Sequence, residues 1–193
     1  KIKLLGIAKS QNADVEIRVH PTLVPKNRLV ANVDGAMNAV LVHGNMVGPT
    51  LYYGAGAGAE PTASAVVADV IDIARQTKLS QNTLIPSLGF MPDKINEKNI
   101  LSIENIISEY YLRFTMKNQA GLLAKITNIF ADHDISINSM VHKEVQENNQ
   151  NPDIFLITSK TKEADIDTII SEIELLPENI EKVVKIRTEE LNK

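Results

Sequence analysis

The stretch YYGAGAGAEPTASAVVADVIDIA, residues 52–74, decides how the first part of the chain folds. Its pattern predicts an apolar strand that runs into a glycine-rich turn. Gly54, Gly56 and Gly58 have no Cβ, so the backbone can adopt positive φ there and another molecule can come close. A strand that leads through such a turn to a helix favours a polar or anionic ligand, because the first N–H groups of a helix have no partner within it.

The helix that follows the turn shows one apolar face. Pro61 suits its first turn, and either Glu60 or Thr62 is placed to cap the free N–H groups, depending on where the helix begins. The apolar residues recur at steps of three and four and predict a face that packs on something. They are Ala63, Val66, Val67, Val70, Ile71 and Ala74.

The glycine spacing leaves two interpretations open. G-x-G-x-G differs from the dinucleotide-binding pattern G-x-G-x-x-G, and no acidic residue ends a following strand roughly 20 positions on. The alternative to a ligand site is a tight strand-to-helix connection in which the glycines only relieve crowding.

Composition is that of a globular chain with room for one large or two small domains. Of 193 residues, 44% are hydrophobic and 23% charged. No apolar run approaches the roughly 20 residues of a membrane span, and the first residues predict a strand rather than a signal peptide. With no cysteine, disulfides and zinc–sulfur sites are excluded. The four histidines show no metal-ligand spacing, so we expect no metal.

Charge is distributed unevenly along the chain. The net charge of −4 argues against nucleic-acid binding. Residues 1–80 hold eight Lys/Arg against six Asp/Glu, whereas the remainder holds twelve against eighteen, which supports two units. The chain begins without Met inside a predicted strand, so we expect a fragment of a longer protein.

Residues 1–80 are predicted to form several strands and one helix. In the second strand, Glu16, Arg18 and His20 alternate with apolar residues, which predicts one wet face, and Pro21 is expected to end it. Gly44-Asn45 predicts a two-residue hairpin. One helix covers only part of such a sheet, so we expect further cover from upstream sequence or a second subunit. Residues 81–108 are polar, are broken by Pro86, Gly89 and Pro92, and predict a linker.

Residues 109–193 show the order β-α-β-β-α-β of the ferredoxin-like fold. Helices are expected at 122–132 and 164–176, and strands at 110–116, 135–145, 153–159 and 180–187. The predicted fold class is therefore α+β, a mixed sheet followed by a ferredoxin-like domain. Helices on one face leave the other face or an edge available to a partner.

Four motifs resemble the C-terminal part of the catalytic region of homoserine dehydrogenase. They are KLLGIA at 3–8, HPTLVP at 20–25, MNAVLVHGNMVG at 37–48 and YGAGAGAEPTASAVVAD at 53–69. The resemblance implies that residues 1–80 are the remnant of a dehydrogenase catalytic domain whose Rossmann domain is absent. The family reduces aspartate semialdehyde to homoserine with NADPH or NADH, on the route to threonine, methionine and isoleucine.

The resemblance also implies where the active site lies. The family's substrate-holding carboxylates and its proton-handling lysine come before Lys1, so we expect no catalytic residue here and no activity from this chain alone. In the family, the glycine turn closes on the nicotinamide end of NADP or NAD. Gly56 is the best single candidate for a cofactor contact, with Gly54 and Gly58 beside it. The expected neighbour is thus the ring and substrate, not the pyrophosphate.

Two further motifs resemble an ACT domain, the small amino-acid-sensing module. They are NQAGLL at 118–123 and DISINSM at 134–140. In the usual D-x-P-G-x-L turn, Asn118 replaces the aspartate and Ala120 the proline. A carboxylate suits an effector's ammonium group better than an amide does, although Asn118 still offers a carbonyl and an NH₂. The resemblance implies effector contacts from Asn118, Ala120, Gly121, Leu122, Ser136 and Asn138.

A simpler interpretation of this turn stays open. Asn118 and Gly121 can merely form a strand-to-helix connection, and ACT domains also serve as pure dimer contacts. The leading hypothesis is part of a cytoplasmic homoserine dehydrogenase with feedback regulation, threonine being the first effector to test. The expected assembly is a homodimer or larger homo-oligomer, with no membrane partner. The alternatives are a non-catalytic amino-acid sensor and a dimerisation module.

Overall fold

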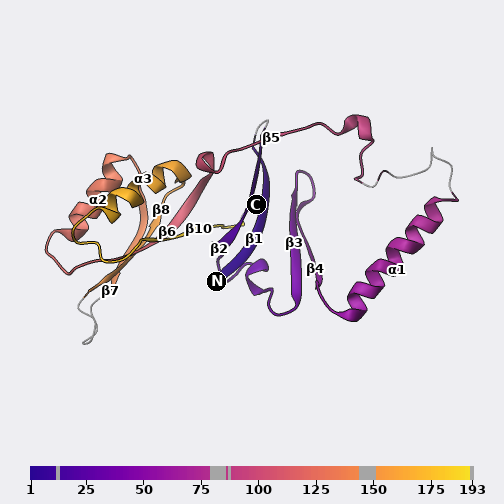
Figure 1. Ribbon diagram of the computed structural model, residues 1–193, viewed down its shortest axis with the longest axis horizontal. Coiled ribbons are helices and arrows are strands. Elements are labelled where there is room, and N and C mark those ends of the chain that lie inside the picture. The colour runs from indigo at the N-terminus through magenta and orange to yellow at the C-terminus, as the bar shows by residue number, and fades with distance from the viewer. Residues whose placement is uncertain (12–13, 79–85, 87, 144–150, 192–193) are drawn as a thin grey trace. The chain divides into compact units, whose positions relative to one another are not determined.

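The computed structural model describes residues 1–193 apart from 12–13, 79–85, 87, 144–150 and 192–193 (Figure 1). Contacts divide the described chain into two compact units. One joins Lys1–Lys26 to Asn99–Leu191, and the other comprises Asn27–Lys98. These two units differ from the predicted segments 1–80, 81–108 and 109–193. The division into those three segments stays a prediction.

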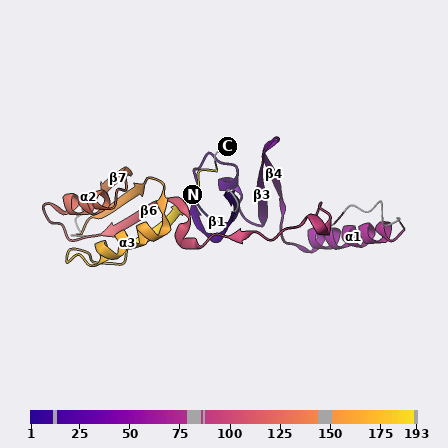
Figure 2. The ribbon, with the colours of Figure 1, turned by 90° about the horizontal axis from the view of Figure 1, so that it is seen from above.

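The first unit contains the predicted β-α-β-β-α-β order. Its elements are β6 (Ile107–Thr115), α2 (Leu122–Asp132), β7 (Ile137–Lys143), β8 (Asp153–Thr158), α3 (Glu163–Glu174) and β10 (Val184–Thr188). The strands lie side by side in the order β10-β6-β8-β7, and each neighbouring pair is antiparallel. Figure 2 shows α2 and α3 with these strands from above. This is the ferredoxin-like arrangement, as predicted.

The core of this unit lies between the sheet and the helices α2 and α3. Alternate residues of β6, from Tyr110 to Phe114, face the same side and are fully buried. Against them pack residues of α2 and α3 at steps of three and four. The buried set from these helices is Leu122, Ile126, Phe130, Ile166, Ile169 and Ile173. Both helices therefore cover one face of the sheet.

A hairpin from the start of the chain extends the same sheet. β1 (Ile2–Gln11) pairs with β2 (Asp14–Leu23) along its whole length. β2 then pairs in parallel with β10 at one end and with the short β5 (Asn99–Ile100) at the other. These parallel pairs make the sheet mixed and confirm the predicted fold class.

The predicted wet face of β2 is wrong. Glu16 and Arg18 are buried, whereas Ile17 and Val19 are 53% and 71% exposed. The register of β2 on β10 explains the reversal: Thr22 lies opposite Arg187, so the even-numbered residues of β2 share the face of the charged groups on β10.

Pro21 also does not end the strand. β2 continues to Leu23, and Pro21 lies opposite Leu4 of β1. Proline is tolerated in a strand at positions where the ladder does not need its N–H. Short elements flank the ferredoxin-like strands: η4 (Ile103–Asn105) precedes β6, and β9 (Thr161–Lys162) pairs with its first residues.

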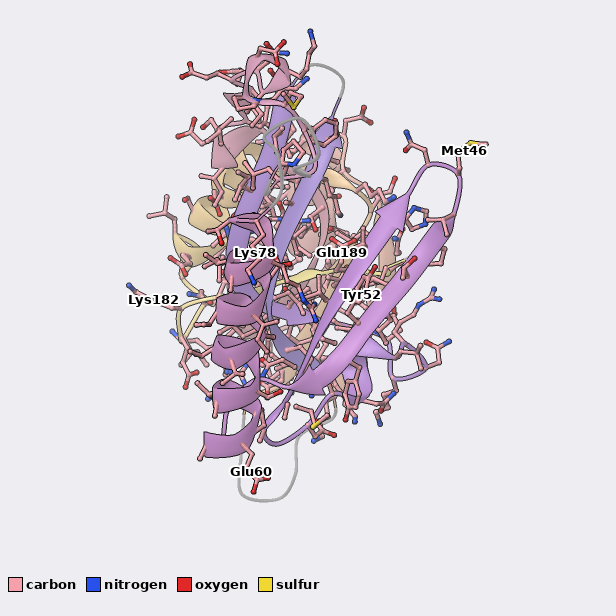
Figure 3. All side chains as sticks on the ribbon, turned by 90° about the vertical axis from the view of Figure 1, so that its right-hand side faces the viewer. Met46, Tyr52, Glu60, Lys78, Lys182 and Glu189 are labelled. Carbon is pink, nitrogen blue, oxygen red and sulfur yellow. The ribbon has the colours of Figure 1, made fainter. Side chains whose placement is uncertain are left out.

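The second unit consists of a hairpin and a helix. β3 (Met37–Gly44) and β4 (Gly48–Ala55) pair antiparallel, and α1 (Ala59–Gln76) follows. The short helices η1 (Val30–Asn32) and η3 (Pro92–Lys94) flank them. The hairpin loop has three residues, 45–47, with Gly48 at φ 74°, and not the predicted two. Figure 3 shows Met46 at the tip of this loop. A three-residue loop followed by a residue with positive φ is a common bulged hairpin.

Candidate functional site

The glycine turn joins β4 to α1, as predicted. Gly58 is the N-cap residue of α1, and no side chain caps the helix, so the predicted caps Glu60 and Thr62 are not used. Thr62 N–H donates the first helical hydrogen bond to Gly58 O at 3.2 Å. Figure 3 shows Tyr52 on β4 and Glu60 at the start of α1.

The three glycines of the turn have different surroundings. Gly58 has φ 126°, a conformation that L side chains rarely adopt. A Cβ on Gly56 would lie 2.6 Å from Cγ of Asn38, whereas a Cβ on Gly54 would have no atom within 4 Å in the part of the chain that the structure describes. Gly56 N–H donates to Ala36 O at 3.2 Å, which ties the turn to the start of β3.

The apolar face of α1 is exposed. No residue of α1 is buried, and Val70 is 60% exposed. The same holds for large apolar residues of the neighbouring hairpin, Val40, Val42, Tyr52 and Tyr53. The described residues of this chain therefore do not supply the cover that the amphipathic pattern predicts.

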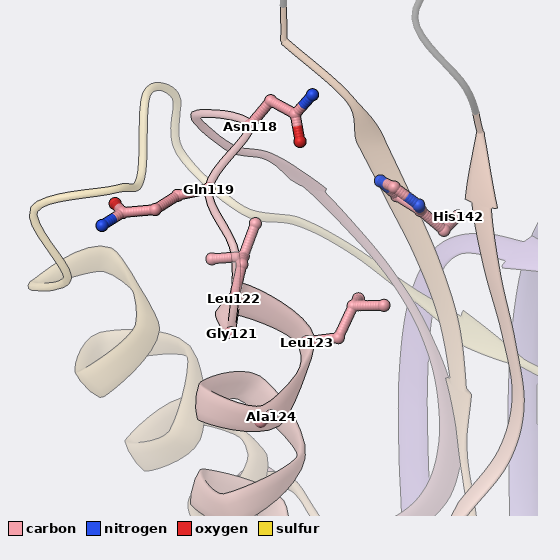
Figure 4. A pocket seen from close by; sticks show the side chains of 7 residues that line it. All are labelled: Asn118, Gln119, Gly121, Leu122, Leu123, Ala124 and His142. Carbon is pink, nitrogen blue, oxygen red and sulfur yellow. The ribbon is translucent and has the colours of Figure 1, made fainter.

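A small cavity lies at the first strand-to-helix turn of the ferredoxin-like domain. Its volume is about 170 Å³, and its lining residues are Asn118, Gln119, Gly121, Leu122, Leu123, Ala124 and His142. In Figure 4, Asn118 and His142 lie on the same side of the turn, whereas Gln119 points away. Gly121 has φ 85° and is the N-cap of α2 without any side-chain cap, so the N-terminal end of α2 borders the cavity.

The predicted effector residues divide between this cavity and other places. Asn118, Gly121 and Leu122 line the cavity, whereas Ala120 is exposed in the same turn and is not part of the lining. Asn138 lies toward the other end of β7, where Nδ2 donates to Thr158 O at 3.1 Å. Ser136 precedes β7, and its backbone oxygen accepts from Ser159 N at 2.8 Å. The structure therefore does not bring Ser136 and Asn138 to the cavity.

His142 is one of four lining residues that were not predicted as effector contacts, beside Gln119, Leu123 and Ala124. It pairs with Ile154 of β8, whose buried side chain belongs to the core, so His142 lies on the face that α2 covers. A signal is present in the sequence: Met140 and His142 lie two residues apart in the predicted strand 135–145, and strand alternation places them on the same side.

A buried carboxylate organises the charges beside α3. Glu163, at the start of α3, is 3% exposed and accepts hydrogen bonds from the Tyr110 hydroxyl at 2.7 Å and from Arg187 Nε at 2.8 Å. Lys185 Nζ donates to the other carboxylate oxygen. Burial by itself raises the pKa of Glu163, but the hydrogen bonds from Arg187, Lys185 and Tyr110 outweigh it and lower that pKa.

A second group of charges ties the β1–β2 hairpin to the end of β10. The Glu189 carboxylate accepts from Arg18 Nη2 at 2.9 Å and from Lys9 Nζ at 2.7 Å. The backbone N–H of Glu189 also donates to Leu23 O at 2.9 Å. Nearby, burial lowers the pKa of His20, and the positive charges of Arg187 and Arg18 lower it further. These charges stabilise one arrangement of hairpin and strand.

Within the described residues, no group of three or more His, Cys, Asp or Glu could hold a metal ion. The described helices include none that is long and apolar enough to cross a membrane.

The fold places the first unit in the ferredoxin-like class of α+β domains. Within that class, residues 110–178 match the family model of the ACT domain. Residues 1–71, at the start of the chain, match the family model of homoserine dehydrogenase. The predicted resemblance is confirmed: the chain carries a homoserine dehydrogenase segment followed by an ACT domain.

Relatives named homoserine dehydrogenase align with the whole chain. It is 45% identical to homoserine dehydrogenase from Pseudomonas aeruginosa and 45% identical to that from Neisseria gonorrhoeae, in each case over 192 residues. The alignments cover 100% of this chain and 44% of each relative. The chain therefore spans less than half the length of these curated relatives.

Solved structures agree with the sequence comparison. The crystal structure of a homoserine dehydrogenase from Thiobacillus denitrificans matches with 50% identity and a TM-score of 0.89, over 100% of this chain and 43% of that one. The Staphylococcus aureus homoserine dehydrogenase at pH 6.0 matches with 26% identity and a TM-score of 0.62. The glycine turn and the ACT domain of this chain thus both lie within the region of likeness to homoserine dehydrogenases.

Proposed function

We propose that this chain acts as part of a cytoplasmic homoserine dehydrogenase. In this proposal the enzyme reduces aspartate semialdehyde to homoserine with NADPH or NADH. The observation that carries it is 45% identity to named homoserine dehydrogenases over the whole chain, glycine turn included. The hydride and proton-transfer groups belong to the longer enzyme, so this chain contributes a wall of the site.

The glycine turn fits a bound nicotinamide at one position. The described residues leave space open where a Cβ of Gly54 would stand, so a flat ring can approach the backbone of β4 closely there. When bound, the cofactor supplies the hydride. The residues of this chain shape the surface against which the ring and the substrate lie.

The 193-residue chain alone is the direct test of this division of labour. We expect no NADPH- or NADH-dependent reduction of aspartate semialdehyde by the purified chain, and activity from the full-length enzyme that contains it. Turnover by the 193 residues at the rate of the full-length enzyme would show that the catalytic groups lie within this chain.

The ACT domain is proposed to bind an amino-acid effector in the cavity beside α2. At about 170 Å³ the cavity is smaller than the roughly 300–1,000 Å³ of drug-sized pockets, which suits a single small amino acid such as threonine. The Asn118 carbonyl can accept from an ammonium group, while His142 and the N-terminal end of α2 can donate to a carboxylate.

Calorimetric titration of the chain with threonine, methionine and isoleucine tests effector binding. We expect heat from one of the three and its loss in Gly121→Asp, because a side chain at φ 85° strains the turn and a carboxylate repels the effector's own. Circular dichroism of the variant checks that the domain still folds. The absence of binding heat for all three amino acids in the unmodified chain would contradict effector binding in this cavity.

A second candidate function is an oligomerisation module, which the proposed homo-oligomer also requires. The observation that favours it is the exposed apolar face of the β1–β2 hairpin, with Leu4, Ile17 and Val19 uncovered. Light scattering decides the matter: a dimer or larger species supports this function, and a monomer at micromolar concentration contradicts it.

A further inference from the structure

The three glycines of the turn are required for different physical reasons. At Gly58 the reason is conformational, because φ is 126° and any side chain would be strained there whatever space is available. Gly54 and Gly56 are not among the described residues with positive φ, so their lack of a Cβ needs another explanation.

At Gly56 the explanation lies within the chain. A Cβ there would stand 2.6 Å from Cγ and 3.3 Å from Cβ of Asn38, and closer still to Nδ2. Rotating only the amide of Asn38 would leave its Cγ in place, so an alanine at 56 forces Asn38 into another χ1 rotamer. Asn38 Nδ2 donates to Ala36 O at 3.5 Å, the same carbonyl that accepts from Gly56 N–H. Asn38 therefore packs across the turn and fixes its path.

At Gly54 no contact among the described residues explains the glycine. It lies inside β4, where glycine weakens a strand, and a Cβ would have no atom of the described residues within 4 Å. Gly54 is directly opposite Asn38 in the hairpin, so its missing side chain would stand on the same face as the Asn38 carboxamide. A ligand that lies over Gly54 meets that carboxamide at its edge.

We infer that Gly54 is the ligand-facing residue of the turn and that Asn38 is a positioning residue that holds the turn by packing on Gly56. This rests on the proposed function, in which the ligand is a nicotinamide cofactor. It moves the cofactor contact from Gly56, the best candidate from the sequence, to the glycine two residues earlier.

A mutant cycle in the full-length enzyme separates the two roles. We expect Gly54→Ala to raise the KM and Kd for the nicotinamide cofactor by about tenfold or more at unchanged Tm, since an added methyl group stands where the ring would lie. We expect Gly56→Ala to lower Tm by about 2–4 °C, and Asn38→Ala to abolish that loss in the double variant because the clash is removed. Asn38→Ala alone should raise the cofactor KM more than it lowers kcat.

The possible results are distinguishable. Gly56→Ala at the Tm of the unmodified enzyme, or a loss of Tm that Asn38→Ala does not relieve, overturns the positioning role of Asn38. Unchanged cofactor binding in Gly54→Ala together with weakened binding in a stable Gly56→Ala overturns the assignment of Gly54. If neither variant alters cofactor binding in the folded enzyme, the proposed cofactor site at this turn is itself wrong.

Discussion

Helices α1 and α2 carry the same kind of amphipathic pattern, yet the structure buries one and exposes the other. Ile126 and Phe130 of α2 lie in the core, whereas Val66 and Val70 of α1 are more than half exposed. α2 has the alternate residues of β6 to pack on, and no described residue of α1 is buried. An apolar stripe predicts a face that needs cover, but it does not say whether the cover lies in the same chain.

The largest expected effect comes from a substitution in the core on which α2 packs. Phe114→Ala should destabilise the ferredoxin-like unit by about 3–5 kcal/mol, because its fully buried ring leaves a cavity. Urea unfolding of the chain, followed by circular dichroism, measures this. Val70→Ala on α1 is the matched control and should change little. An equal loss in both variants would show that α1 is buried in solution, and the contrast would fail.

A second prediction concerns the buried carboxylate beside α3. Glu163→Gln should cost about 2 kcal/mol at neutral pH, because hydrogen bonds to a buried charge are lost. The folded pKa of Glu163 lies below its ordinary value of 4.5, so its stabilisation is complete above that pH and is lost as pH falls through the folded pKa.

Acid titration of stability therefore distinguishes the variant. Below pH 4.5 the unmodified chain should lose stability more steeply than Glu163→Gln. Asp165→Asn, an exposed acid in the same helical turn, is the control and should keep the steep acid limb. Parallel acid limbs in the chain and in Glu163→Gln would exclude Glu163 as the titrating group.

The third prediction concerns the contribution of His142 to effector binding in the cavity of the ACT domain. His142→Ala should weaken binding of the effector amino acid by roughly tenfold, the loss of one good hydrogen bond to a charged group. Calorimetry measures it, and Lys143→Ala, one residue along β7 on the opposite face, is the matched control. Equal affinity in His142→Ala would remove this residue from the site while leaving the cavity in place.

The smallest expected effect concerns the junction between the hairpin and β10. Glu189→Gln should cost about 1 kcal/mol, because its charge pairs with exposed Lys9 and buried Arg18 are lost while Glu16 still pairs with Arg18. Hydrogen exchange should rise in β1 and β2 and stay unchanged in β8, whereas exposed Glu181→Gln should alter neither. Uniform exchange across the unit would mean that Glu189 does not hold the hairpin separately.

Much of the ferredoxin-like unit could be predicted from its sequence. The bounds of α2 match the prediction. The predicted strand at the start of this unit is also present as β6, where the alternate residues Tyr110, Leu112 and Phe114 share the buried face. Local periodicity suffices there because each apolar face finds its partner within about 80 residues of the same chain. Among the residues that line the cavity, Asn118, Gly121 and Leu122 belong to the turn motif, whereas His142 comes from a strand distant in sequence.

In the hairpin β1–β2, the sequence did not predict which face of β2 is buried. Alternation correctly predicted a strand through Ile17 and Val19, but the apolar side was taken as the buried one. The long-range pairing of β2 with β10 reverses this, because it brings Arg18 to Glu189. Such a pairing depends on residues about 170 positions apart, which no local window contains.

The sequence by itself determined the helices, most strands, the ferredoxin-like order and the family resemblance, because these depend on local period and on motifs. Only the tertiary structure decided which faces are covered, which residues line the cavity and why each glycine of the turn lacks a side chain. The physical reason is that burial and close contact depend on what stands opposite a residue in space. For Gly56 that neighbour is Asn38, and for Gly54 the described chain offers none.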